Sequence, residues 1–143
     1  HNVLEYVPDV PAVMRALGSL LGEGGLVSLL VRQRAGEVMR AALKPHDLEA
    51  ARAALAVECV TESLYGGPAR TFDADALRAL LTGQGFEIVA ERGVRVVADY
   101  LPASLSETEE AYTRLLGFES ELGARPEFAS VARYRQVIAR LTA

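Results

Sequence analysis

The hydrophobic positions at the start of the chain pass from a helical spacing to a strand-like run. Behind Pro11, which suits a first helical turn, valine and leucine recur at helical spacing up to Leu21, and a glycine-rich turn follows. Residues 26–31 then form an apolar run, which is typical of a strand covered on both faces, as in a parallel sheet flanked by helices. This order of helix, glycine turn and buried strand predicts an α/β fold.

The middle of the chain predicts two short helices and a less regular connection. Both helical stretches lie within residues 34–57, where Pro45 separates them and Asp47 can cap the second. Residues 58–70 lack a clear period and contain a Gly-Gly-Pro turn signal. We expect a lid or an irregular connection there.

A further helix and a long strand follow. The helix is capped by Thr71 or Asp73 and ends near Gly83. Residues 86–97 form two strand-like runs that meet at Gly93, which predicts one long strand with a bend or bulge at that glycine.

The last third predicts two helices and a terminal strand. Ser106 and Glu109 have capping-box spacing and open a helix that runs towards Leu122. A short helix is expected within 127–132, and residues 134–141 are expected to form the final strand. The chain has no internal repeat and no obvious linker, so one domain or a large part of one is predicted.

Composition agrees with a folded domain and excludes several kinds of site. Half of the 143 residues are hydrophobic and 24% are charged, and no apolar run approaches the roughly 18 residues of a membrane span. One cysteine and two histidines allow no disulfide framework, metal cluster or Cys-His nucleophile pair. No signal peptide is visible, so a cytoplasmic location is expected. The net charge of -4 gives no overall basic field, and any RNA binding must be local.

Three segments carry a more specific pattern. They are HNVLEYVPD at 1–9, GVRVVADYL at 93–101 and PEFASVARYRQVIAR at 126–140. With the Gly-Gly turn and strand that follow the first segment, they resemble the bacterial tRNA 5-carboxymethoxyuridine (uridine 5-oxyacetic acid) methyltransferase family. That family is related to the SmtA-type enzymes, which are class I methyltransferases dependent on S-adenosylmethionine (SAM).

The resemblance covers nearly the whole chain and implies the second half of a Rossmann-like sheet. In that sheet, flanked by helices, a parallel strand is followed by antiparallel terminal strands, and the last strand inserts beside its predecessors. The glycine-rich loop that approaches SAM after the first strand of such enzymes is missing from this sequence. Residues 1–143 are therefore expected to be the carboxy-terminal part of a methyltransferase domain, with poor SAM binding and no activity as an isolated chain.

The resemblance also assigns roles to individual residues. His1 would lie against SAM, at the carboxyl end of a strand that precedes the chain. Arg32 follows the strand 26–31, at the place where the methyl acceptor would approach. The family often has an aromatic residue and an Asn at the positions of Arg32 and Gln33. This departure leaves the acceptor open.

A second group of residues offers contacts to an acidic acceptor. On an alternating strand Arg95 would share a face with Asp99, either as an ion pair or as a fork that holds the carboxylate of a modified uridine, with Tyr100 beside them. Arg133 and Tyr134 offer a fork for carboxylate or phosphate and a ring for stacking on an unpaired base. No catalytic residue is expected, because an ionised carboxylate needs alignment with the SAM methyl group and no general base.

Three functions stay open on this evidence. The parent enzyme is expected to methylate the uridine carboxylate in tRNA, or to use SAM on a small-molecule acceptor. The third possibility is a non-catalytic folded unit that forms a homodimer through an exposed sheet edge.

Overall fold

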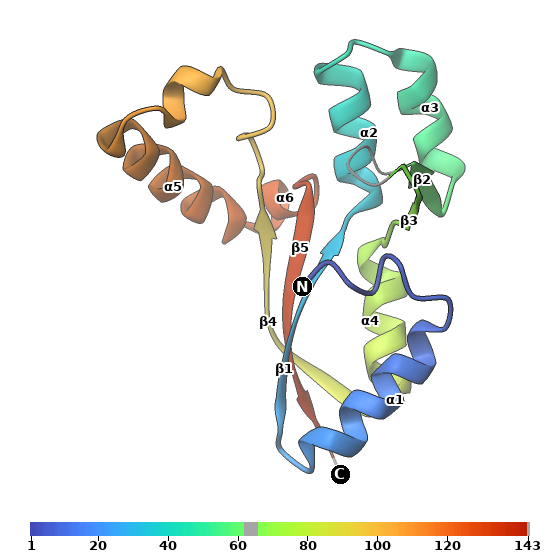
Figure 1. Ribbon diagram of the computed structural model, residues 1–143. Coiled ribbons are helices and arrows are strands. Elements are labelled where there is room, and N and C mark those ends of the chain that lie inside the picture. Colours follow the sequence, from blue (N-terminus) through green and yellow to red (C-terminus); the bar gives the residue numbers. More distant parts are fainter. Residues whose placement is uncertain (62–65, 143) are drawn as a thin grey trace.

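A three-stranded sheet forms the centre of the molecule (Figure 1). The computed structural model describes residues 1–61 and 66–142. The sheet has the order β1 (Leu26–Arg32), β5 (Tyr134–Leu141) and β4 (Phe86–Val94), and β5 is antiparallel to both neighbours. The predicted antiparallel insertion of the last strand is confirmed, and β5 has the bounds expected from the sequence.

The parallel pairing expected for β1 is not found in the described part of the chain. β1 and β4 run in the same direction, but β5 lies between them. Leu29 and Val31 are buried, whereas Leu26 is 54% exposed, so the apolar run of β1 is not covered along its whole length. The run reflects one well-covered face and a partly open second face.

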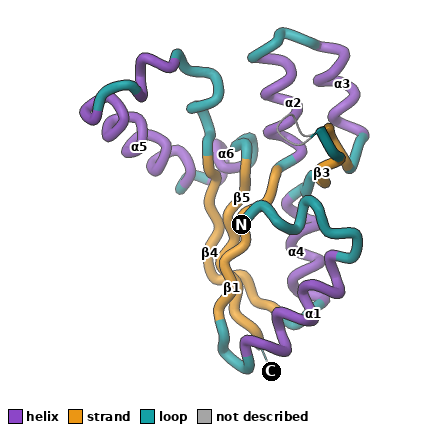
Figure 2. Tube along the Cα trace, in the orientation of Figure 1, coloured by secondary structure: helices purple, strands orange, loops and turns teal. Residues whose placement is uncertain are grey.

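Two helices cover the buried face of the sheet, as Figure 2 shows. They are α1 (Val10–Leu21) and α4 (Ala74–Gly83). Met14 from α1 and Leu77 and Leu81 from α4 pack against Phe86 and Val137 of the strands in the main core. Burial of these apolar side chains is the main force that holds the helices on the sheet.

An aspartate caps the N-terminus of each of these helices, because its carboxylate accepts a hydrogen bond from a backbone N–H of the first turn. Asp9 accepts from Ala12 N at 2.8 Å, and Asp73 accepts from Ala76 N at 2.7 Å. Asp73 is therefore the cap of α4, and the alternative Thr71 is not: its hydroxyl donates to the carbonyl of Glu58 at 3.2 Å.

A helical hairpin extends beyond the carboxyl end of β1. It consists of α2 (Arg34–Leu43) and α3 (Leu48–Ala56), and Asp47 caps α3 as predicted. The connection that follows contains the antiparallel pair β2 (Cys59–Thr61) and β3 (Pro68–Arg70), so it is more regular than expected. The rest of the expected lid, residues 62–65, lies outside the described residues.

The bend in β4 is not at Gly93. The register shifts between Ile88 and Ala90, and the strand ends at Val94. A Cβ on Gly93 would lie 2.7 Å from Ala129 Cα, so this glycine permits a close approach of two backbones and does not create a bulge.

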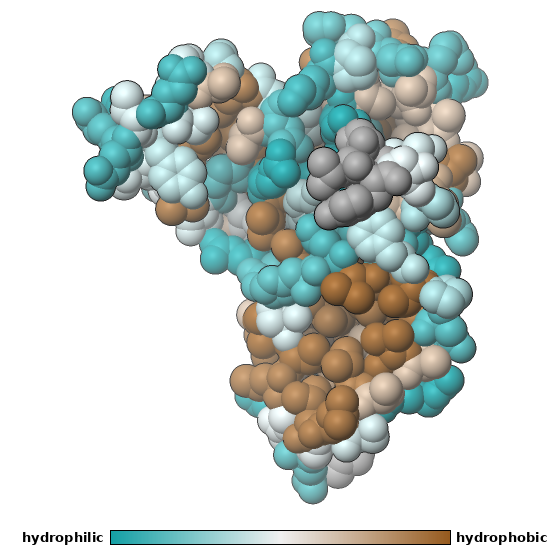
Figure 3. Space-filling model, in the orientation of Figure 1, coloured by the Kyte–Doolittle hydropathy of each residue, from teal (hydrophilic) through white to brown (hydrophobic). Residues whose placement is uncertain are grey.

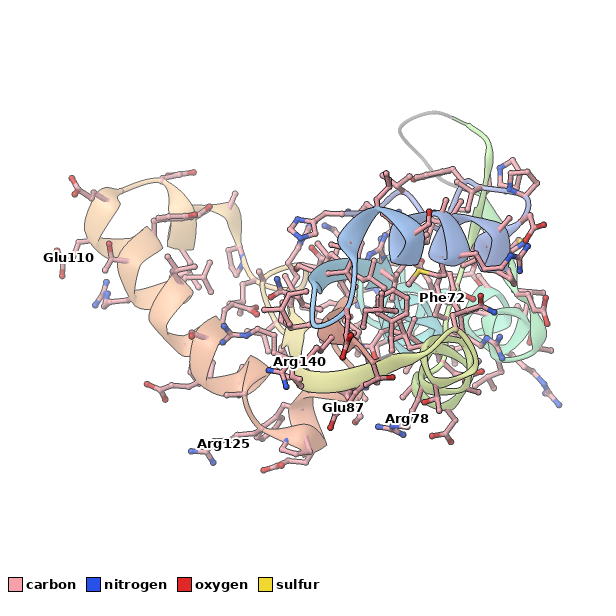
Figure 4. The ribbon with its side chains drawn as sticks, turned by 90° about the horizontal axis from the view of Figure 1, so that it is seen from below. Phe72, Arg78, Glu87, Glu110, Arg125 and Arg140 are labelled. Atoms are coloured by element: carbon pink, nitrogen blue, oxygen red, sulfur yellow. The ribbon has the colours of Figure 1, made fainter. Side chains whose placement is uncertain are left out.

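A segment that extends away from the sheet follows β4, as the α2–α3 hairpin does after β1. It contains the 3-10 helix η1 (Ala103–Ser106) and α5 (Glu109–Gly123), and α6 (Pro126–Ala129) leads back to β5. Figure 4 shows α5 reaching away from the sheet, with Glu110 at its far end. Its N-cap is Thr108, which accepts from Ala111 N at 3.2 Å, and the predicted cap Ser106 instead closes η1. In the described ranges no helix is long and apolar enough to cross a membrane.

Candidate functional site

Most of the candidate side chains gather where β5 begins and its two neighbours end. Tyr134 pairs with Arg32 of β1 on one side and with Val94 of β4 on the other. The guanidinium carbons of Arg32, Arg95 and Arg133 lie 5.7, 5.9 and 5.7 Å from the centroid of the Tyr134 ring. The structure thus brings together four of the residues that the sequence suggested for acceptor binding, around one aromatic ring.

Glu37, in the first turn of α2, forms ion pairs with two of these arginines. Its carboxylate lies 2.8 Å from Arg32 Nη1 and 3.2 Å from Arg133 Nη1, and all three residues are buried. Burial alone would lower the pKa of Arg32, but the hydrogen bond and charge of Glu37 outweigh it and raise that pKa. Glu37 therefore fixes Arg32 and Arg133 in place beside Tyr134. Sequence reasoning missed Glu37.

Gln33 and Gly36 hold α2 against the segment that precedes β5. The Gln33 amide nitrogen donates to the carbonyls of Ala129 and Ala132, both at 2.9 Å, and its oxygen accepts from Arg135 Nε at 2.9 Å. A Cβ on Gly36 would lie 2.4 Å from the Ala132 carbonyl oxygen. Gln33 therefore has a structural role at this site and is fully occupied by it.

Arg95 and Asp99 lie in a turn and not on a strand, so the predicted alternation is wrong. Arg95 has a φ of 58°, which takes the chain out of the strand, yet its guanidinium still pairs with Asp99. Asp99 also lies 3.9 Å from Arg133 Nε. The prediction of an Arg95–Asp99 ion pair is confirmed, although for a different geometric reason.

Glu119 of α5 fixes this turn. Its carboxylate accepts three backbone hydrogen bonds, from Val96 at 2.7 Å, Val97 at 2.8 Å and Ala98 at 2.7 Å. The Arg95 side chain is 53% exposed, whereas those of Arg32 and Arg133 are below 10%. Arg95 is consequently the guanidinium of the three that is open to a ligand.

Two buried polar groups beside the cluster have unsatisfied hydrogen-bonding atoms. Within the described residues, the two carboxylate oxygens of Glu5 have no hydrogen-bond partner of good geometry. The same is true of the Tyr100 hydroxyl. Burial raises the pKa of Glu5, and the charge and backbone N–H of Arg32 offset this only in part. Burial, and then the charge of Asp99, raises the pKa of Tyr100.

Glu5 lies in a turn and is 3% exposed. The signal for it in the sequence is an acidic residue inside the apolar run V-L-E-Y-V, because a buried carboxylate is rare without a special environment.

His1 lies apart from the arginine cluster. Its Nε2 is 3.1 Å from Ser28 Oγ. Ser28 precedes Arg32 by four residues on β1, so the two residues are roughly 13 Å apart along the strand. A hollow of about 270 Å³ beside it is lined mainly by apolar side chains from α1 and β1. Figure 3 shows apolar residues gathered over this part of the surface.

The family model for a methyltransferase domain matches residues 1–91, which is more than half of the chain. The chain belongs to this methyltransferase domain family. The tRNA 5-carboxymethoxyuridine methyltransferases of Escherichia coli K12 and O157:H7 are each 29% identical to it over 146 aligned positions, covering 98% of this chain and 52% of theirs. The chain thus spans about half the length of the curated relatives it matches.

A solved structure shows the same fold. It is the crystal structure of a SAM-dependent methyltransferase from Mesorhizobium loti, with a TM-score of 0.55 and 18% identity over 96% of this methyltransferase domain and 57% of that chain. The resemblance recognised in the sequence is confirmed at the level of family and fold.

The hollow beside His1 shows few features of a SAM pocket among the described residues. The hollow beside His1 is smaller than the roughly 300–1,000 Å³ of most ligand pockets. Within the described ranges, the residues that line it include Asn2, whose buried Oδ1 has no partner, but no carboxylate that could hold ribose hydroxyls. The predicted contact between His1 and SAM stays a prediction.

Proposed function

We propose that this chain provides the acceptor-binding part of a SAM-dependent methyltransferase. The acceptor in this proposal is a carboxylate carried on an unpaired base, as in 5-carboxymethoxyuridine of tRNA. The observation that carries the proposal is the set of three guanidinium groups around the Tyr134 ring. Tyr134 is 9% exposed and its ring is surrounded by these arginines, so it positions them, and the more exposed guanidinium fork of Arg95 matches a carboxylate.

The arginines divide into two roles under this proposal. Arg32 and Arg133 share Glu37, are buried and keep Tyr134 in position. Arg95 is half exposed, and its turn is held by Glu119, so it presents the fork to the acceptor. The Tyr100 hydroxyl also lacks a partner among the described residues, but it is buried and not open to a ligand in this structure.

SAM supplies an activated methyl group when it is bound. The acceptor carboxylate is already ionised at neutral pH, so no residue of this chain has to remove a proton. The arginines align the carboxylate and reduce its freedom, which is the main contribution that this site can make to the rate. The rate of methyl transfer is then expected to vary little with pH above the pKa of the acceptor.

Calorimetric titration with three nucleosides tests the acceptor. We expect 5-carboxymethoxyuridine to bind more tightly than its methyl ester or uridine, and Arg95→Gln to weaken binding of the acid about tenfold, or ~1.4 kcal/mol. Arg125→Gln removes an exposed arginine elsewhere on the surface and is the matched control (Figure 4). Equal affinities for the acid and its ester would count against a carboxylate acceptor.

A small-molecule acceptor is the alternative. The formal charge of -4 and the pairing of all three cluster arginines with carboxylates favour it, because neither feature attracts a polyanion. Mass spectrometry of tRNA nucleosides separates the two acceptors. An unchanged level of the modified-uridine methyl ester in a strain that lacks the protein would exclude the tRNA substrate.

A further inference from the structure

A second hollow lies next to the cluster, between α5 and the open face of β4 and β5. It measures about 200 Å³ and is lined by Arg92, Val94, Arg95, Leu116, Ser120 and Gln136, together with Gly93 and Glu119. Gln136 stands two residues after Tyr134 on β5, so their side chains share one face of the sheet. Arg95 contributes both to this hollow and to the surroundings of the Tyr134 ring. The two sites are therefore continuous.

Arg92 differs from the arginines around it. Within the described residues its guanidinium has no carboxylate partner, whereas Arg32, Arg95, Arg133 and Arg135 are all in ion pairs. Its Nη2 donates to the carbonyl and the hydroxyl of Ser120, at 3.2 and 3.1 Å. These neutral contacts orient the guanidinium and leave its charge uncompensated.

The acidic residue in the same hollow does not cancel this charge by direct contact. Both carboxylate oxygens of Glu119 accept from the backbone N–H groups of residues 96–98. Those donors spread the negative charge of Glu119 over the turn. An anion can therefore approach Arg92 from the open side of the hollow, with the Ser120 hydroxyl as a further donor. The Gln136 amide, in contrast, already donates to Ser28 Oγ at 3.1 Å.

We infer that this hollow binds the phosphodiester next to the acceptor nucleotide in an RNA strand. This inference rests on the proposed function, in which Arg95 holds the carboxylate of the modified base. Arg92 then contacts phosphate, while Val94 and Leu116 offer apolar surface to the ribose. The contact is independent of base identity, so it contributes to affinity for the strand and not to choice of base.

The test measures RNA binding by fluorescence anisotropy at several salt concentrations. The probe is a single-stranded, unmodified pentanucleotide centred on uridine, and the free nucleoside 5-carboxymethoxyuridine is titrated separately. We expect Arg92→Gln to weaken RNA binding on the order of tenfold. The plot of log affinity against log salt concentration should become shallower, with the magnitude of its negative slope smaller by about 0.7, the value for one phosphate contact on a single strand. Nucleoside binding should not change.

Two variants control this result. Arg114→Gln removes the same charge from an exposed site on α5, the helix that lines the hollow, and should leave RNA binding nearly unchanged. Arg92→Lys keeps the charge and should retain the salt slope of the wild type, which separates loss of a phosphate contact from loss of structure.

The outcomes for the two sites are distinct. Equal RNA affinities for Arg92→Gln and Arg114→Gln, or no RNA binding by the wild type, would overturn the phosphate site. If the nucleoside does not bind but RNA binding depends on Arg92, the proposed acceptor fails and the phosphate site stands.

Discussion

The Glu5 carboxyl group lies in an environment that disfavours its charge. It is 3% exposed, and burial raises its pKa above the ordinary value of 4.5, with Arg32 and Arg133 opposing and Glu37 adding to the shift. A raised pKa means that the folded state binds the proton more tightly than the unfolded state. The stability from this proton is therefore present below pH 4.5 and is lost as the pH rises through the folded-state pKa.

Glu5→Gln should consequently raise the free energy of unfolding at pH 7. At this pH the wild type loses stability because Glu5 is either ionised while buried or has to bind a proton above its ordinary pKa. The gain should disappear near pH 4. Urea denaturation of both proteins at the two pH values measures this difference, with the exposed Glu49→Gln as the control. A stability loss at pH 7 would show that the ionised carboxylate is instead an essential partner of Arg32.

The three hydrogen bonds to Glu119 make a second prediction at the scale of one residue. Glu119→Gln replaces a charged acceptor of three N–H groups by a neutral amide and should destabilise the fold by about 2 kcal/mol. It should also weaken binding of a carboxylate ligand through Arg95, which the turn positions. Glu121→Gln, on the same helix and exposed, should change neither the urea midpoint nor ligand binding.

At the scale of elements, the position of α2 depends on a close approach at its first turn. A Cβ on Gly36 would lie 2.4 Å from the Ala132 carbonyl oxygen and 2.7 Å from Arg133 Cα, both backbone atoms that cannot move aside. Gly36→Ala should therefore cost about 1–3 kcal/mol, although alanine is the better helix former. It should also displace Glu37 from Arg32 and Arg133.

Gly117→Ala is the matched substitution, because a Cβ at this helical position meets nothing within 4 Å. It should be stabilising by about 0.4–1 kcal/mol through the lower entropy of the unfolded chain. Thermal unfolding followed by circular dichroism compares the two variants. A similar midpoint for both would show that α2 can shift to accommodate the methyl group.

Local signals in the sequence were sufficient for several elements. Asp47 capped α3 as expected, and the bounds of β5 were correct, because a helix cap and an apolar run are determined by neighbouring residues. The turn at Arg95 could not be predicted in this way. It depends on Glu119, which lies more than 20 residues further along the chain and bonds to the backbone of residues 96–98. The sequence predicted the arginines of the cluster only as separate residues, because Glu37, which pairs with Arg133, lies 96 positions away from it in the chain.

At the scale of the whole molecule, the free edge of β1 is covered only in part. Asn2 N donates to the Leu30 carbonyl at 2.8 Å and Phe72 N to the Arg32 carbonyl at 2.9 Å, which occupies the carboxyl half of that edge. In the described residues, residues 26–28 have no strand on this side, and the apolar hollow beside His1 adjoins them. An open edge next to apolar surface favours pairing with another strand.

We therefore expect the chain to associate with itself through residues 26–28, so that its apparent mass in light scattering rises with concentration. Leu26→Lys places a charge on the edge at a position that is 54% exposed, and it should restore a monomer without loss of stability. Leu55→Lys changes an equally apolar residue of α3 that is 63% exposed and remote from the edge, so it should leave association unchanged. A monomer at every concentration would show that Asn2 and the apolar residues around it protect this edge sufficiently.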